Sequence, residues 1–219
     1  MTIEIKSLTL GLAVTNCYLL GDSETGEAIL IDPVDNAELL HETAHKAGWT
    51  VKLILATHGH FDHVLASKRL KELTGAPFYI HENGQEWLDQ LPAQGLMFTG
   101  RPFPEAAKPD RLLPDEGDPI EVGSIRLEPI YTPGHSHDHL SFYLPSNNLV
   151  FSGDCLFFGS IGRTDLPYGD HDLLMESITT KLLPLGDDVR VYPGHMETTS
   201  IGYERKTNPF ILDYLKQKP

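Results

Sequence analysis

Apolar and polar residues alternate over the first ten positions, which predicts a β-strand over residues 3–9, and short apolar runs predict strands over 16–20 and 28–31. The pattern then changes between helical spacing and short apolar runs. It predicts a helix over 36–47, a strand over 51–56, a helix over 62–73, a strand over 77–80 and a short helix over 83–89. This half of the chain therefore alternates between strands and helices.

The second half repeats this order after an irregular segment. Residues 90–118 contain five prolines and the apolar run Leu96-Met97-Phe98, which suits a mobile lid, a dimer contact or a packed loop. We expect a packed loop, and we hypothesise that it overhangs the functional site. Further elements are predicted as strands over 120–122, 124–130, 140–144 and 149–152, a helix over 171–183 and a strand over 189–192.

The two halves share a local pattern. In each, a hairpin leads to a carboxylate just past an apolar strand, Asp32 in the first half and Asp154 in the second. This similarity indicates two duplicated halves within one domain over residues 1–219. Strands followed by helices, twice over, predict an α+β fold with two mixed sheets packed together and helices outside.

The stretch Thr57-His58-Gly59-His60-Phe61-Asp62-His63 indicates a metal site. On an extended segment, His58 and His60 share one face, and Asp62 and His63 then open the following helix. Asp62 alone could be a helix cap, but a cap explains one residue of the four. Imidazoles combined with a carboxylate are the mixed ligands that catalytic metal sites use.

Three more candidate ligands each follow a strand directly and come after a glycine. They are His135 after Gly134, Asp154 after Gly153, and His195 after Gly194. A glycine lets the backbone turn sharply at the strand end and direct the next side chain into a shared cleft. We therefore expect these residues to complete the metal site.

The amino-acid composition limits the kinds of molecule that the protein is expected to bind. Asp and Glu number 31 against 17 Lys and Arg, so the formal charge is −14. Nucleic-acid binding depends on basic residues that neutralise phosphates, so we expect no nucleic-acid partner. Cys17 and Cys155 are the only cysteines, which argues against a disulfide framework. The first ten residues suit a strand rather than a signal peptide, and no segment has membrane-spanning length, so we expect a cytoplasmic protein without membrane contact.

Together these motifs resemble the metallo-β-lactamase superfamily, through His-x-His-x-Asp-His, Pro-Gly-His, the strand-end Gly-Asp and the late Gly-His. Within it the chain is similar to the glyoxalase II group, and most of all to its short bacterial hydrolases. That likeness rests on four stretches and a tail: residues 132–136, 151–157, 162–167, 193–195 and 198–210. The resemblance implies the four-layer αβ/βα sandwich of the superfamily.

The resemblance also implies a site and a reaction. One metal would be held by His58, His60 and His135, a second by Asp62, His63 and His195, and Asp154 would bridge them. Two divalent ions would stabilise a bridging hydroxide that attacks a thioester carbonyl, such as that of S-lactoylglutathione, and Asp62 would also orient the hydroxide. Zinc suits this set, and iron and manganese bind the same donors.

Other readings stay open at this point. Relatives of the same fold include a mononuclear iron persulfide dioxygenase, which would use His58, His135 and Asp154, and the same hydroxide would open a lactone or a β-lactam. The presence of all second-site ligands disfavours the dioxygenase. A metal-binding module without turnover is the third alternative. The sequence leaves the oligomeric state open.

Several residues around the motifs receive secondary roles. His139 is expected to orient a ligand from behind, while His137 and Asp138 are expected at the surface and Cys155 as an inert buried thiol. The candidates for a substrate carboxylate are the cations Arg163, Arg205 and Lys206. Full-length glyoxalase II enzymes carry a C-terminal helical region that holds glutathione, whereas only residues 196–219 follow His195 here. We therefore expect the substrate to bind differently or to be another thioester.

Overall fold

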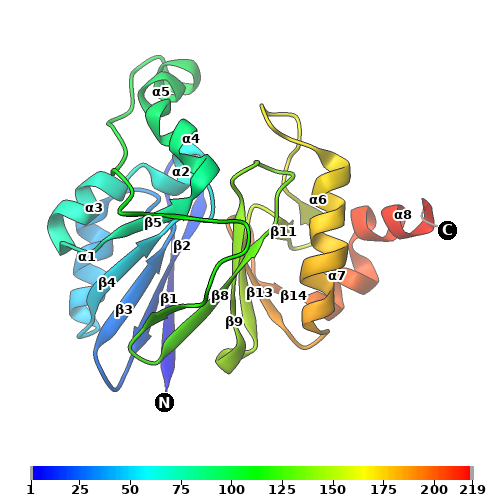
Figure 1. Ribbon diagram of the computed structural model, residues 1–219, viewed down its shortest axis with the longest axis horizontal. Helices are drawn as coiled ribbons and strands as arrows, with labels where there is room; N and C mark the ends of the chain where they lie inside the picture. Colours follow the sequence, from blue (N-terminus) through cyan, green and yellow to red (C-terminus); the bar gives the residue numbers. More distant parts are fainter. Residues whose placement is uncertain (1, 218–219) are drawn as a thin grey trace.

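Two six-stranded sheets face each other in this computed structural model, which describes residues 2–217, and helices cover the outer face of each sheet (Figure 1). Most of the first sheet and its helices α1 and α3 lie on the left of Figure 1, and the second sheet with α6 and α7 lies on the right. The α+β sandwich of two mixed sheets predicted from the sequence is confirmed.

The first sheet comes from the first half of the chain and has the order β1-β2-β3-β4-β5-β6. Its strands are β1 (Ile3–Leu10), β2 (Thr15–Asp22), β3 (Glu27–Ile31), β4 (Thr50–Leu55), β5 (Phe78–His81) and β6 (Arg111–Leu113). The helices of this half are α1 (Ala37–Lys46), α2 (Phe61–Val64), α3 (Ser67–Thr74), α4 (Gln85–Asp89) and α5 (Leu91–Thr99). Strands β3 to β6 are parallel, so the residues after β3 and β4 emerge at one edge.

The second sheet has the order β14-β13-β10-β9-β8-β7. Its strands are β7 (Ile120–Val122), β8 (Ile125–Tyr131), β9 (Leu140–Leu144), β10 (Leu149–Gly153), β13 (Arg190–Pro193) and β14 (Thr199–Ser200), and β11 (Leu156–Phe157) pairs with β12 (Ser160–Ile161) as a separate hairpin. The helices are α6 (His171–Ser177), α7 (Ile201–Thr207) and α8 (Pro209–Gln217). Strands β10 and β13 are parallel neighbours, so Asp154 and His195 follow adjacent strand ends.

Alternation along the strands sorts the core into layers. In β2 and β3, Leu19 and Leu30 pack towards α1 and α3, whereas Leu20 and Ile29 pack against the second sheet. All four side chains are fully buried, and each such burial contributes about 1.5–3 kcal/mol. A third cluster joins the second sheet to α6 and the C-terminal helices. The two sheets therefore form a rigid base beneath the loops at their common edge.

The irregular segment predicted over 90–118 is wrong in part, because it contains α5 and β6. Pro92 lies in the first turn of α5, where a missing N–H costs nothing, and Gly100 ends the helix in the left-handed conformation. The helix predicted over 62–73 is two helices, α2 and α3, with a break at residues 65–66. The helix predicted over 171–183 continues past α6 as a π-helix, Ile178–Leu182.

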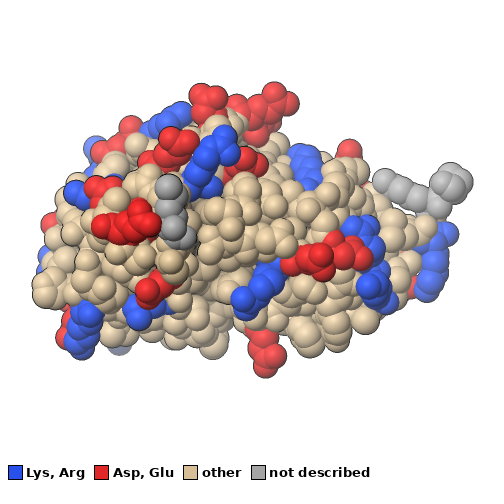
Figure 2. Space-filling model, turned by 90° about the horizontal axis from the view of Figure 1, so that it is seen from below, with Lys and Arg blue, Asp and Glu red and all other residues tan. Residues whose placement is uncertain are grey.

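On the face of the molecule seen in Figure 2, acidic and basic side chains are interspersed rather than gathered by sign. This agrees with a net negative charge that is distributed along the chain. Within residues 2–217, no helix combines the length and the apolar character needed to cross a membrane.

Candidate metal centre

Seven side chains predicted as metal ligands lie together where strands of both sheets end. They are His58, His60, Asp62, His63, His135, Asp154 and His195. They form three overlapping groups, and within each group the ligand atoms lie within 4.8 Å of one another. Strand β4 precedes the first motif, and β8, β10 and β13 precede the other three ligands.

The first group is His58, His60 and His135, and all three are buried. The Nδ1 of His60 lies 3.0 Å from the Nε2 of His58 and 2.9 Å from the Nε2 of His135. The Nδ1 of His135 lies 2.7 Å from the carbonyl oxygen of Arg163, which can only accept, so this nitrogen carries the proton. The Nε2 of His135 therefore presents a lone pair to the group.

The same reasoning fixes the ring of His58. The hydroxyl of Thr57 donates to the carboxylate of Asp32 at 3.0 Å, so it accepts from the Nδ1 of His58, also at 3.0 Å. The Nε2 of His58 is then a second lone pair directed at His60. A single proton on His60 cannot fully satisfy both lone pairs, whereas a cation among the three nitrogens can.

The second group is Asp62, His63 and His195. The Nδ1 of His63 donates to Asp32 at 2.9 Å, and its Nε2 lies 3.6 Å from Asp62 and 3.4 Å from Asp154. The Nε2 of His195 is 3.3 Å from both of these carboxylates. The Nε2 of His63 and the Oδ1 of Asp154 are buried without a hydrogen-bond partner. A cation between these two atoms would satisfy both of them once the Nε2 of His63 carries no proton.

The surroundings of the two groups shift the pKa values of their histidines in opposite directions. Burial, with the neighbouring His135, lowers the pKa of His60 to about 3. Burial opposes protonation of His195, but its hydrogen bonds with Asp154 and Asp62 raise its pKa to about 10. Burial tends to raise the pKa of Asp154, yet the charge of His63 and a hydrogen bond from His195 hold it well below its ordinary value. The carboxylates therefore attract positive charge, whether protons or a metal.

Asp154 faces both groups, because its Oδ2 lies 3.5 Å from the Nε2 of His135 and 3.3 Å from the Nε2 of His195. Nitrogen and carboxylate donors in these two sets fit two divalent cations that share one carboxylate. Gly194 permits this approach, since a Cβ there would lie 2.2 Å from the Oδ1 of Asp154. Gly153 has a φ of +48°, a left-handed backbone conformation that glycine adopts more readily than other residues.

Two supporting residues received no role from the sequence. Asp32 accepts hydrogen bonds from the backbone N–H and hydroxyl of Thr57 and from His63, so it orients ligands of both groups. Thr15 donates to Asp62 at 2.8 Å. The signal for Asp32 was its place just past an apolar strand, the same place that Asp154 has in the second half.

His139 and Asp138 both lie behind the ligands. The Nε2 of His139 accepts from the backbone N–H of Asp154 at 2.9 Å, a placement that supports its predicted orienting role. The prediction of Asp138 at the surface is wrong, because it is fully buried. Its Oδ2 accepts from the backbone N–H of Gly59 at 2.7 Å, and its Oδ1 accepts from the hydroxyl of Ser136. His137, also expected at the surface, is half-buried. Cys155 is fully buried, and burial raises the pKa of its thiol, which agrees with an inert thiol.

A cavity of about 560 Å³ opens above the ligands and is lined by His60, Asp62, His135, Asp154 and His195 together with α5. Arg163 also lines it, with its guanidinium ion-paired to Asp165. Arg205 and Lys206 lie elsewhere, ion-paired to Asp187, and this placement gives no support for a role in substrate binding.

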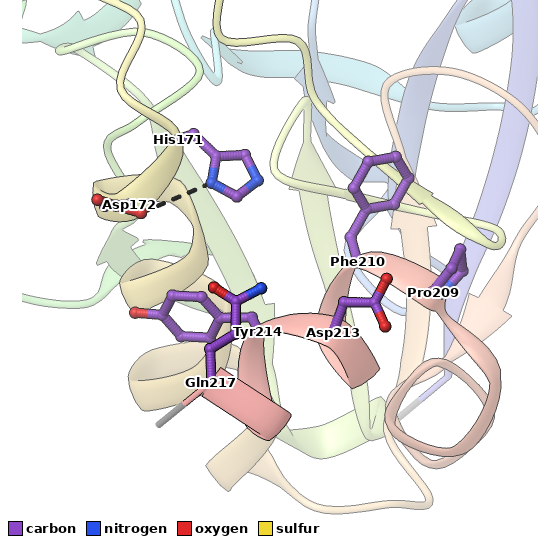
Figure 3. Close-up of a pocket in the computed structure, with 7 residues that line it drawn as sticks. All are labelled: His171, Asp172, Pro209, Phe210, Asp213, Tyr214 and Gln217. Atoms are coloured by element: carbon purple, nitrogen blue, oxygen red, sulfur yellow. Dashed lines mark ion pairs between the residues drawn. The ribbon is translucent and has the colours of Figure 1, made fainter. Parts of the chain in front are cut away.

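A second cavity of about 620 Å³ lies between the start of α6 and helix α8 (Figure 3). The ring of His171 faces Asp213 and Phe210 across it, and the Nδ1 of His171 lies 3.7 Å from the Oδ1 of Asp172. The described residues that line it include none of the predicted ligands. The histidine and carboxylate side chains among these described residues do not form a group of three close enough together to hold a metal ion. The chemistry therefore belongs to the first cavity.

An αββα sandwich with two groups of histidine and carboxylate donors at its strand ends defines a metal-dependent enzyme. A model of the metallo-beta-lactamase superfamily matches residues 10–195. The chain belongs to this superfamily and is a metallo-hydrolase. It is 40% identical over 212 residues to the hydroxyacylglutathione hydrolase GloC of Haemophilus influenzae, covering 96% of this chain and 98% of that protein.

Solved structures agree with this assignment. The crystal structure of BLEG-1 B3 metallo-beta-lactamase has a TM-score of 0.89 at 39% identity and covers 95% of this chain and 99% of that chain. That of TTHA1623 in a di-iron-bound form has a TM-score of 0.84 at 36% identity, covering 94% and 99%. The superfamily binds divalent metals, and the seven side chains here supply a matching donor set.

Proposed function

We propose that this metallo-hydrolase cleaves a glutathione thioester such as S-lactoylglutathione at a centre of two divalent metals. The observation that carries the proposal is a pair of candidate ligand groups beneath one open cavity, with Asp154 within 3.5 Å of a histidine from each. The similarity to a hydroxyacylglutathione hydrolase supports the substrate class. Zinc suits the donors, and iron is the alternative that the di-iron relative supports.

Bound divalent metals supply a water that is deprotonated near neutral pH and a positive charge for the carbonyl oxygen. The residues of the chain provide the orientation. Asp62 lines the cavity. Burial tends to raise the pKa of its carboxyl group, but the charge of His63 and the hydrogen bond from His195 lower that pKa to about 2. It is therefore ionised at neutral pH and can accept a hydrogen bond that orients the attacking water, while Thr15 donates to its Oδ2. The leaving thiolate needs little protonation because thiols are fairly acidic.

The first experiment is elemental analysis of the purified chain, combined with an assay of S-lactoylglutathione hydrolysis on the same sample. We expect about two metals per chain with turnover, and loss of turnover in Asp62→Ala. A single iron per chain, no hydrolysis, and oxygen uptake on glutathione persulfide would instead establish the dioxygenase. Measurable hydrolysis of any ester or thioester would also remove the alternative of a metal-binding module without turnover.

A second candidate activity is β-lactam hydrolysis, and the similarity to the BLEG-1 B3 metallo-beta-lactamase favours it. The same orienting residues serve either reaction, because both need water to attack a carbonyl. A parallel assay with a chromogenic cephalosporin separates the two. We expect kcat/KM for the thioester to be the larger, and the reverse order would move the assignment to the β-lactam.

A further inference from the structure

The cavity above the metal ligands has walls of different chemistry. Asp62 and Asp154 lie at its polar end, and helix α5 contributes Ala93, Met97 and Phe98. The remaining lining residues include Leu166 and Pro167. An acyl group attached to a carbonyl at the metal ligands can therefore contact a mainly apolar surface.

The apolar side chains on α5 are unusually exposed. Met97 is 80% and Phe98 51% exposed, although both are large hydrophobic residues. The ring of Phe98 lies 5.1 Å from that of Phe61, which also lines the cavity, so the surface continues from α5 to α2. A contiguous exposed apolar surface beside a reactive centre is typical of a groove that binds part of a ligand.

Cationic groups for a substrate carboxylate are scarce in the same cavity. Of the described residues that line it, Arg163 alone is a lysine or arginine. Its Nε and one terminal nitrogen bond the two oxygens of Asp165, both at 2.7 Å, which compensates its charge. Glutathione carries two carboxylates, and no lysine or arginine among the described lining residues is free of an ion pair to receive either. The glutathione portion of a thioester is therefore expected to remain largely in solvent.

We propose that the cleft selects thioesters by an apolar acyl group, an aliphatic chain or an aromatic ring, which packs against Met97 and Phe98 of α5. This inference rests on the proposed thioesterase function and names its substrate class. Each methylene that leaves water for this surface stabilises the bound acyl group. A short polar acyl group such as lactoyl fills little of the cavity and gains little from the wall.

The test is a series of glutathione thioesters that share one thiol and differ in the acyl group: acetyl, lactoyl, butanoyl and hexanoyl. We expect kcat/KM to rise from acetyl to hexanoyl by about two- to fourfold per added methylene. A flat or falling series, with good turnover of every member, overturns the acyl selectivity and leaves the thioesterase function standing. No turnover of any member by protein that holds two metals would overturn the thioesterase function itself.

Two variants on the same helix locate the contact. Met97→Gln places an amide in the wall and preserves length and helix propensity, and we expect it to reduce the preference for hexanoyl over acetyl by about three- to tenfold. Leu96→Gln is the matched control, because Leu96 is 56% exposed on α5 and is not among the described residues that line the cavity. An equal preference in wild type and Met97→Gln, or an equal loss in both variants, would contradict contact with this wall.

Discussion

The two groups of candidate metal ligands both lie close to Asp154, but they differ in charge and in exposure. His58, His60 and His135 offer imidazole nitrogens without a carboxylate and are at most 7% exposed. The other group places a carboxylate beside two imidazoles, and it includes His195, whose side chain is 21% exposed. The pKa of His60 is lowered to about 3, whereas that of His195 is raised to about 10.

This difference in pKa decides whether a metal must displace protons from the histidines of a group when it binds. Burial lowers the pKa of both His58 and His60, so at neutral pH no extra proton on these two imidazoles competes with a metal. The carboxylates of the second group hold protons on His63 and His195 until a metal replaces them. Metal binding that releases protons becomes tighter as the pH rises. The first group should therefore bind its metal over a wide pH range, and the second only with a strong pH dependence.

The largest effect is expected from removing the residue that the groups share. Asp154→Ala deletes a donor from both, so we expect kcat to fall by about 10²–10³-fold or more and the metal content to fall below two per chain. Elemental analysis and the thioester assay measure both quantities. Asp172→Ala, a 95% exposed carboxylate in the other cavity, is the control and should retain metal and activity. Two tightly bound metals in Asp154→Ala would contradict the shared ligand.

Variants that keep one group at a time test the difference in charge directly. His195→Ala preserves the first group, and its remaining metal affinity should change little above about pH 6. His135→Ala preserves the second group, whose affinity should rise with pH until His195 loses its proton near pH 10. Chelator-competition titrations between pH 6 and pH 10 give both curves. Parallel curves for the two variants would show that the groups do not differ in this way.

The sequence singled out the candidate ligands that the fold brings together, because their signals are local. The first four ligands lie within six residues, and the other three each follow a glycine at a strand end. The apolar strands were also predictable, since burial on both faces requires continuous apolar runs. Helix α5 was missed because its apolar run at residues 96–98 is exposed and its buried positions include Gln94 and Gly95, so no helical periodicity marks it. The duplication of the two halves stays a prediction.

The burial of Asp138 was missed for a different reason. A carboxylate between two histidines is usually a surface residue. Asp138 can be buried here because it accepts a hydrogen bond from the backbone N–H of Gly59, 79 positions earlier. Asp32 likewise contacts His63 across 31 positions. No local pattern encodes such pairs, so supporting residues are harder to predict than the ligands that they orient.

Asp32 should affect the second group more than the first, because it bonds the ring of His63 directly. In Asp32→Asn the side chain keeps its shape but loses the charge that stabilises the Nδ1 proton of His63. We expect metal affinity of the second group to fall by about 10–100-fold. Metal titration of Asp32→Asn beside Asp172→Asn measures this, and unchanged affinity would remove Asp32 from the orienting residues.

The smallest effect is expected at Asp138, which supports the first group through the backbone of Gly59 rather than through an imidazole ring. Asp138→Asn retains an oxygen that accepts from Gly59, so metal affinity should change less than about tenfold. Asp138→Ala leaves the N–H of Gly59 and the hydroxyl of Ser136 without this partner, at a cost of about 1–3 kcal/mol in the free energy of unfolding. Urea unfolding and metal titration of both variants separate the two quantities. If Asp138→Asn lost as much affinity as Asp32→Asn, the charge rather than the acceptor would be what the first group needs.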